Sequence, residues 1–335
     1  VAFWQAVGPK GIKAEVRQRY FALLGVPELL EKGEYLVSLS DFVPFYQEGA
    51  EELSKQFERA QEAPWSPSQF PTVAALLEKN AKSLRVLAEG AKRPRYYSPL
   101  VSAADGSLAD AELAIGSPEI HEVTRQLAAR GMLQLGTGNI DGAWEEILAG
   151  CRLLRLYAQQ PLFIHRVIAI ARQDAINRIA VALSQSNAVS ADRLKDFQSQ
   201  WVEVTPLPSS TDVWNGGERL YGHSYVYEIA RDKNQAKAFK TIDWLFNFGD
   251  DSAKRQFQAL KKIMSQKDMD WSEVLRCRNR LTDRAIQEMG SGPYSKRFAA
   301  MTAIEKEASQ SAAQAADEVL RSEEHTSELQ SLRHL

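Results

Sequence analysis

Residues 117–158 read SPEIHEVTRQLAARGMLQLGTGNIDGAWEEILAGCRLLRLYA, and this stretch decides the predicted fold. It opens with a strong helix start. Ser117 supplies a capping hydroxyl, Pro118 suits the first turn, and Glu119 faces the positive end of the helix dipole. Apolar side chains then recur at three- and four-residue spacing until the GTGN break at residues 136–139, after which a second helical pattern begins. Two helices joined by so short a turn predict an αα-hairpin.

Helical patterns continue on both sides of this hairpin. Further helices are predicted over residues 72–90, 161–183, 190–201, 213–231, 252–264, 272–289 and 294–319. Thr72 is the expected cap of the first of these, and Gly90 is its expected end. Strand signals are scarce, and a short extended piece is expected only within residues 35–45. The sequence therefore predicts an all-α or nearly all-α fold, built as an irregular multi-helix array of αα-hairpins.

Breaks in these patterns divide the chain into five predicted parts. An N-terminal helical segment (1–91) and a helical hairpin core (111–204) flank an irregular loop (92–110), and a C-terminal helical region (205–320) follows. Residues 321–331 read, codon for codon, as the translation of a sequencing-library adapter. Residues 321–335 are therefore interpreted as an artefactual tail. The chain opens with Val1 rather than Met, which we interpret as a processed leader or a fragment.

The composition is that of an ordinary globular protein. The 335 residues are 44% hydrophobic and 25% charged, enough for one large domain or two smaller ones. A net charge of −2 exerts no general attraction on nucleic acid or anionic lipid. No apolar run approaches the ~20 residues that cross a bilayer. Cys151 and Cys277 lack metal-site spacing and are interpreted as unpaired core thiols, with a long-range disulfide as the alternative.

The hairpin resembles a tetratricopeptide unit. Gly131, Ala143 and Gly150 occupy positions where that repeat has small residues at its helix crossing, and Gly138 lies in the turn. Arg130 stands where the repeat usually has leucine, and no second copy follows about 34 residues later. The resemblance implies a single repeat-like hairpin. An ordinary antiparallel helix pair explains the same residues equally well.

Three segments also resemble a family of uncharacterised bacterial helical proteins. They are residues 87–100, which contain KRPRYYSPL, residues 130–156, which contain GAWEEIL, and residues 207–219. This resemblance brings no established activity and no catalytic residues. Members of that family often begin with a hydrophobic anchor. The resemblance therefore implies an envelope location through an anchor that this fragment lacks, and the sequence otherwise leaves the compartment unknown.

Few residues in the chain suggest catalytic or metal chemistry. Outside the tail, His121, His165 and His223 form no pair four residues apart, so neither a metal site nor a cofactor is predicted. Nucleophile elbows, Walker loops and dinucleotide fingerprints are also absent. The best catalytic candidates lie within residues 217–232, where Glu218, His223 and Glu228 could perform acid–base work. A polar helix face with satisfied hydrogen bonds is the interpretation that we favour for this segment.

Two basic groups are the candidate binding residues. Arg276, Arg280 and Arg284 follow one helix face at four-residue spacing, which is typical of an ion-pair seam or, less commonly, of an anion site. Arg93, Arg95 and Tyr96 combine charge with an aromatic ring, as single-strand binders do. On so short a segment we interpret them as part of a solvated loop, so the nucleic-acid signal is weak.

The predicted function is that of a helical binding or scaffold module whose partner is a protein or peptide. Helix dominance and the lack of a catalytic motif favour this role over enzymatic activity. The alternative is a hydrolase-like enzyme that uses the acid–base cluster in residues 217–232.

Overall fold

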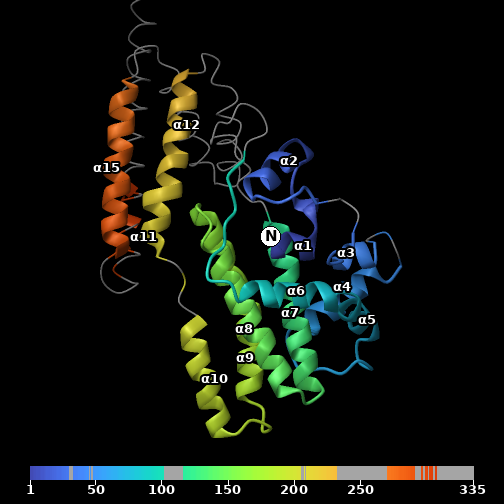
Figure 1. The fold of residues 1–335 in the computed structure, drawn as a ribbon. Helices are drawn as coiled ribbons and strands as arrows, with labels where there is room; N and C mark the ends of the chain where they lie inside the picture. Colours follow the sequence, from blue (N-terminus) through green and yellow to red (C-terminus); the bar gives the residue numbers. More distant parts are fainter. Residues whose placement is uncertain are drawn as a thin grey trace, which may run out of the picture. The chain divides into compact units, whose positions relative to one another are not determined.

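The computed structural model describes residues 1–29, 33–44, 46, 48–101, 116–204, 207, 209–231 and 270–290, with short pieces between 296 and 307. All regular secondary structure in these residues is helical (Figure 1), which confirms the predicted all-α fold class. The predicted helix over residues 252–264, most of residues 294–319 and the tail from residue 321 lie outside the described residues.

Two compact units make up the chain. Unit 1 contains residues 1–106 and 111–209, and unit 2 contains residues 107–110 and 210–335. Each unit is described by itself below.

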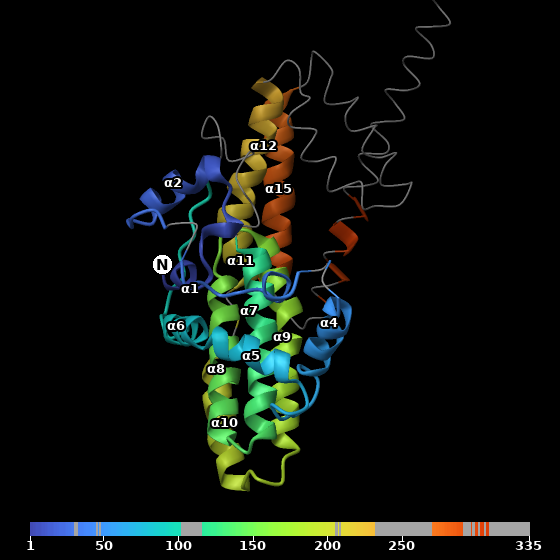
Figure 2. The ribbon, with the colours of Figure 1, turned by 90° about the vertical axis from the view of Figure 1, so that its right-hand side faces the viewer.

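Three long helices form the centre of unit 1. They are α7 (Ser117–Gly136), α8 (Ile140–Tyr157) and α9 (Phe163–Ser184), which lie side by side in both views (Figures 1 and 2). Helix α6 (Ala81–Ala91) packs on α8 and against α1 (Ala2–Val7). Helix α10 (Ala191–Val204) also packs on α8, where the rings of Trp144 and Phe197 stack with centroids 4.3 Å apart. One apolar core joins these helices.

Shorter helices complete the N-terminal part of unit 1. They are η1 (Pro9–Gly11), α2 (Ala14–Leu23), α3 (Leu39–Phe42), α4 (Ala50–Arg59) and α5 (Pro71–Lys79). Trp65, in the segment between α4 and α5, is buried against α7 and donates its indole N–H to the Ala129 carbonyl at 3.0 Å. Gly136 permits this approach, because a Cβ atom there would collide with the Trp65 backbone.

The predicted hairpin turn is present between α7 and α8. Gly138 has φ 79°, the left-handed conformation that glycine adopts without strain. Asn139 then caps α8, because its Oδ1 accepts a hydrogen bond from the Gly142 N–H at 3.0 Å. Both helices of the predicted hairpin are confirmed to within a residue or two.

The predicted single helix over residues 72–90 is wrong, because Asn80 divides it into α5 and α6. Asn80 is 1% exposed, and its Oδ1 accepts from the Val37 N–H at 2.9 Å. Its Nδ2 donates to the Val37 carbonyl and to Gln126 Oε1, both at 2.8 Å. The asparagine side chain thus satisfies both backbone groups of Val37. Pro71, not Thr72, begins the first helix.

Small residues of the hairpin make room for α9. A Cβ atom on Gly131 would lie 2.8 Å from Ile179, and one on Gly150 would lie 2.5 Å from Ile176. Arg130, which departs from the tetratricopeptide pattern, lies between α7 and α8 instead. Its Nε and Nη2 atoms each lie 2.8 Å from an oxygen of the buried Glu146 carboxylate. A tetratricopeptide arrangement stays a prediction.

The two cysteines differ in their surroundings. Cys151 is buried in α8, and this burial raises the pKa of its thiol to about 11. Cys277 is exposed, and neither cysteine is in a disulfide. The predicted core thiol is therefore confirmed for Cys151 and wrong for Cys277.

Unit 2 is described by four helical elements. They are α11 (Ser210–Val213), the π-helical turn η3 (Trp214–Glu218), α12 (Arg219–Arg231) and α15 (Trp271–Gly290). Gly222 on α12 leaves the room that the Arg278 guanidinium of α15 occupies. Arg219 joins the same two helices, donating to Asn279 Oδ1 at 2.9 Å and to Asp283 Oδ1 at 2.5 Å. The described helices of the chain include none with the length and apolar character of a membrane span.

Candidate functional site

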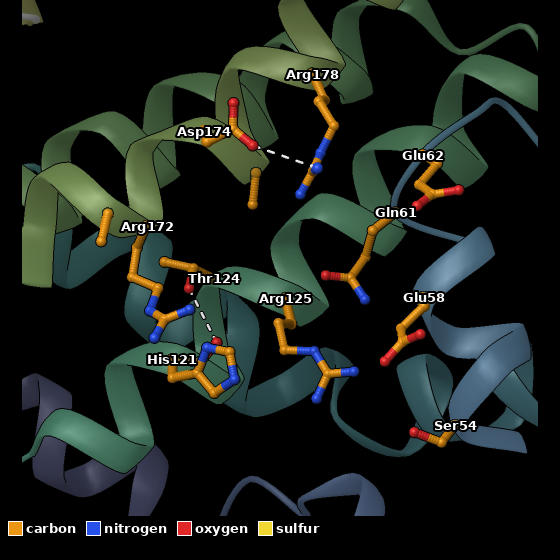
Figure 3. Close-up of a pocket in the computed structure, with 12 residues that line it drawn as sticks. Ser54, Glu58, Gln61, Glu62, His121, Thr124, Arg125, Arg172, Asp174 and Arg178 are labelled. Atoms are coloured by element: carbon orange, nitrogen blue, oxygen red, sulfur yellow. Dashed lines mark hydrogen bonds and ion pairs between the residues drawn. The ribbon is translucent and has the colours of Figure 1, made fainter. Parts of the chain in front are cut away.

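A hollow of about 360 Å³ opens between α4, α7 and α9 in unit 1 (Figure 3). Side chains three or four positions apart, such as Ser54 and Glu58 on α4 or His121 and Arg125 on α7, bring one face of each helix to the hollow. The residues around the hollow are Ser54, Glu58, Gln61, Glu62, His121, Thr124, Arg125, Ala171, Arg172, Asp174, Ala175 and Arg178. All of these residues except the two alanines are polar or charged, so the lining of the hollow is mainly polar.

His121 on α7 and Arg172 on α9 form one side of the hollow, which we call the cationic wall, while Arg125 of α7 extends toward Glu58 (Figure 3). Among the described residues, no carboxylate lies within 4.0 Å of the Arg172 guanidinium, and its buried Nε has no hydrogen-bond partner. The Arg125 guanidinium lies 4.7 Å from the centroid of the Phe57 ring. The one carboxylate within 4.0 Å of it among the described residues is that of Glu122, at 4.0 Å. Arg172 therefore brings an uncompensated positive charge to the hollow.

The neighbouring arginines affect the pKa of His121. Partial burial, together with Arg172 and Arg125, lowers the pKa of His121 to about 4. The imidazole is therefore neutral at pH 7. Its Nδ1 atom is buried and has no hydrogen-bond partner among the described residues. An anion beside this ring would supply both an acceptor and a compensating charge.

Carboxylates occupy the opposite side of the hollow, which we call the acidic wall: Glu58 on α4 and Glu62 just beyond it (Figure 3). Gln61 lies between them in sequence, and its side-chain amide donates to the Phe57 carbonyl at 2.7 Å. A further ion pair lies at the rim, where Arg178 Nη1 is 3.3 Å from Asp174 Oδ2. The hollow thus presents separated charges of both signs.

The predicted acid–base residues lie elsewhere, in unit 2. Glu218 ends η3, whereas His223 and Glu228 lie on α12. Positions five residues apart on an α-helix are rotated by about 140° around its axis, so these three side chains point in different directions. Glu228 lies 3.4 Å from Arg231 of its own helix, and Glu218 acts electrostatically on Arg278 of α15. A catalytic role for this cluster stays a prediction.

The predicted arginine stripe is present on α15, and its members have acidic partners. Arg276 and Arg280 each lie 2.7 Å from a different oxygen of Glu273, on the same helix. Arg284 lies 2.6 Å from Glu307. Ion pairing therefore accounts for the three guanidinium groups, although two of the pairs lie within one helix rather than in a seam between helices.

The predicted basic loop has one anchoring tyrosine. Arg93 and Arg95 are exposed, whereas Tyr96 packs against the core of unit 1. The Tyr96 N–H donates to Gln159 Oε1 at 2.8 Å, and burial raises the pKa of its hydroxyl well above the usual range. Tyr97, by contrast, is 65% exposed. This geometry leaves only Tyr97 free to stack on a base.

The hollow was not predicted from the sequence, although one signal for it was present. His121 and Arg125 are four residues apart on α7 and therefore share a face. Glu58 and Arg172 come from helices far away in sequence, and only the packing of α4 and α9 brings them to that face. The described residues hold no group of three or more His, Cys, Asp or Glu side chains suited to a metal ion.

Comparison of the chain with protein families, with curated proteins and with solved structures gives no match. Both resemblances found in the sequence therefore stay predictions. The chemistry of the hollow is the observation on which a functional proposal can rest.

Proposed function

We propose that this chain is a helical binding or scaffold module, and that the hollow in unit 1 receives an anionic group from a protein or peptide partner. The observation that carries the proposal is Arg172, a partly buried cation with no carboxylate partner in the described chain. Keeping such a charge away from water is unfavourable unless a counter-charge approaches it. A carboxylate is a suitable partner, because guanidinium geometry matches it.

The surface of α9 around the hollow supports a macromolecular partner. Ile164, Val167, Ile170 and Val181 are between 43% and 54% exposed. They lie on both sides, along the helix, of the α9 residues that line the hollow. Exposed aliphatic side chains beside a polar pocket are typical of a protein interface.

The test uses an acidic peptide, acetyl-Ala-Glu-Ala-Glu-amide, and its glutamine counterpart. We expect the full chain to bind the acidic peptide more tightly in calorimetric titration at low salt. Arg172→Gln should weaken this binding about tenfold or more, since a hydrogen bond to a charged group contributes roughly 1.5–3 kcal/mol.

Arg85→Gln is the matched control, because Arg85 is an exposed arginine on α6 that does not line the hollow. It should leave the affinity unchanged. Equal binding of the acidic and glutamine peptides, or equal losses in the two variants, would count against the proposal.

A further inference from the structure

The two walls of the hollow carry opposite charges that do not neutralise each other. The ion pairs described around it, Arg178–Asp174 and Arg125–Glu122, each stay within one helix. Glu58 and Glu62 have no ion pair of 4.0 Å or less with any described residue, and the same holds for Arg172. Figure 3 shows Glu58 and Glu62 on the side of the hollow away from His121 and Arg172, with Arg125 extending between them. A separation of this kind suits a ligand that has a charge at each end.

A ligand with only a negative charge would be attracted to the cationic wall and repelled by the acidic wall. Its carboxylate would neutralise Arg172, but it would also face Glu58 and Glu62 across the hollow. Repulsion between like charges opposes binding, whereas an added ammonium group is attracted to Glu58 and Glu62. The charge pattern therefore favours a ligand that adds an ammonium group over one with a carboxylate alone.

Short side chains also line the hollow. Ala171 and Ala175 are small, and the Thr124 hydroxyl already donates to the Ile120 carbonyl of its own helix at 2.8 Å. These groups offer methyl surface to a connecting chain and leave its polar ends to the walls. A volume of about 360 Å³ exceeds what a carboxylate alone would fill.

We propose that the hollow binds a zwitterion, with its carboxylate against Arg172 and His121 and its ammonium group against Glu58 and Glu62. The ligand class is an amino acid or peptide segment whose two charges are several bonds apart. This inference rests on the proposed function, because it specifies the partner group that enters the same hollow.

The experiment compares three probes of similar length on the full chain: 6-aminohexanoate, hexanoate and hexylamine. Calorimetric titration at pH 7 and low salt should show 6-aminohexanoate binding at least about tenfold more tightly than either singly charged probe. Glycine, whose two charged groups are joined by a single carbon atom, should bind more weakly than 6-aminohexanoate. Acetyl-Lys-Glu-amide then shows whether a peptide segment can replace the small zwitterion.

A double variant locates the ammonium site. Glu58→Gln with Glu62→Gln should remove the advantage of 6-aminohexanoate over hexanoate, whereas Arg172→Gln should weaken both. Glu78→Gln is the control, since Glu78 is an exposed glutamate on α5 outside the hollow. Both acidic positions are exposed, so the double variant should fold.

The outcomes separate the two proposals. If hexanoate binds as tightly as 6-aminohexanoate, or if the double variant keeps the preference, the zwitterion inference is overturned. Binding of the acidic peptide would still support the proposed function in that case. If no probe binds and the acidic peptide also fails, both proposals are overturned.

Discussion

At the scale of single residues, protonation of His121 in the hollow should make the stability of the folded state depend on pH. Its pKa of about 4 lies below the ordinary value of 6.5, so the unfolded chain takes up this proton more readily between those values. Through this group, the folded state should lose stability as pH falls from about 6.5 to about 4. Burial is the largest cause of this lowered pKa, and the charges of Arg172 and Arg125 add to it.

Urea unfolding at several pH values checks this prediction. His121→Gln should give a smaller loss of unfolding free energy than the parent chain between pH 6.5 and pH 4.5. Acidic residues elsewhere titrate in both proteins, so the difference between the two profiles reports His121. Parallel profiles would contradict the assignment.

Gly136 shows how one missing side chain can determine a helix contact. Ala at this position would place a Cβ atom against the Trp65 backbone, which cannot move aside as a side chain can. We expect Gly136→Ala to lower the unfolding free energy by about 2 kcal/mol or more, as overpacking does. Gly216→Ala is the control, because open space surrounds that position. Urea unfolding should show little change for the control, and equal losses would contradict this account.

At the scale of helices, Arg130 and Glu146 hold α7 against α8 through a charge pair. Burial raises the pKa of Glu146, while Arg130 acts in the opposite direction. Arg130→Met should destabilise the chain by about 3 kcal/mol, because it leaves a buried carboxyl group without its partner. Adding Glu146→Leu should recover part of that loss. A double-mutant cycle in urea measures the coupling, and strictly additive losses would exclude it.

The helices also show what the sequence can predict. The turn between α7 and α8 was predictable, because Gly138 and Asn139 act on residues beside them. The break at Asn80 was not, since its partners Val37 and Gln126 lie 43 and 46 residues away. The hollow could not be predicted for the same reason. The spacing of His121 and Arg125 was visible, but the positions of Glu58 and Arg172 depend on tertiary packing.

At the scale of the whole molecule, the division into two units predicts two unfolding transitions. Scanning calorimetry of the full chain should resolve them. Gly136→Ala lies in unit 1 and should lower the midpoint of one transition only. Arg219→Ala, which removes the partner of Asp283 between α12 and α15, should lower the other. A single transition that both variants shift equally would show that the units unfold together.

The contrast between the two cysteines has a practical consequence. A thiol reacts with maleimides through its thiolate, and burial with a pKa of about 11 leaves Cys151 almost entirely protonated and shielded at pH 7. Cys277 is exposed on α15. The unaltered sequence therefore offers one site for attaching a fluorescent dye, on unit 2. A dye there would report on α15 while the hollow of unit 1 keeps its native residues.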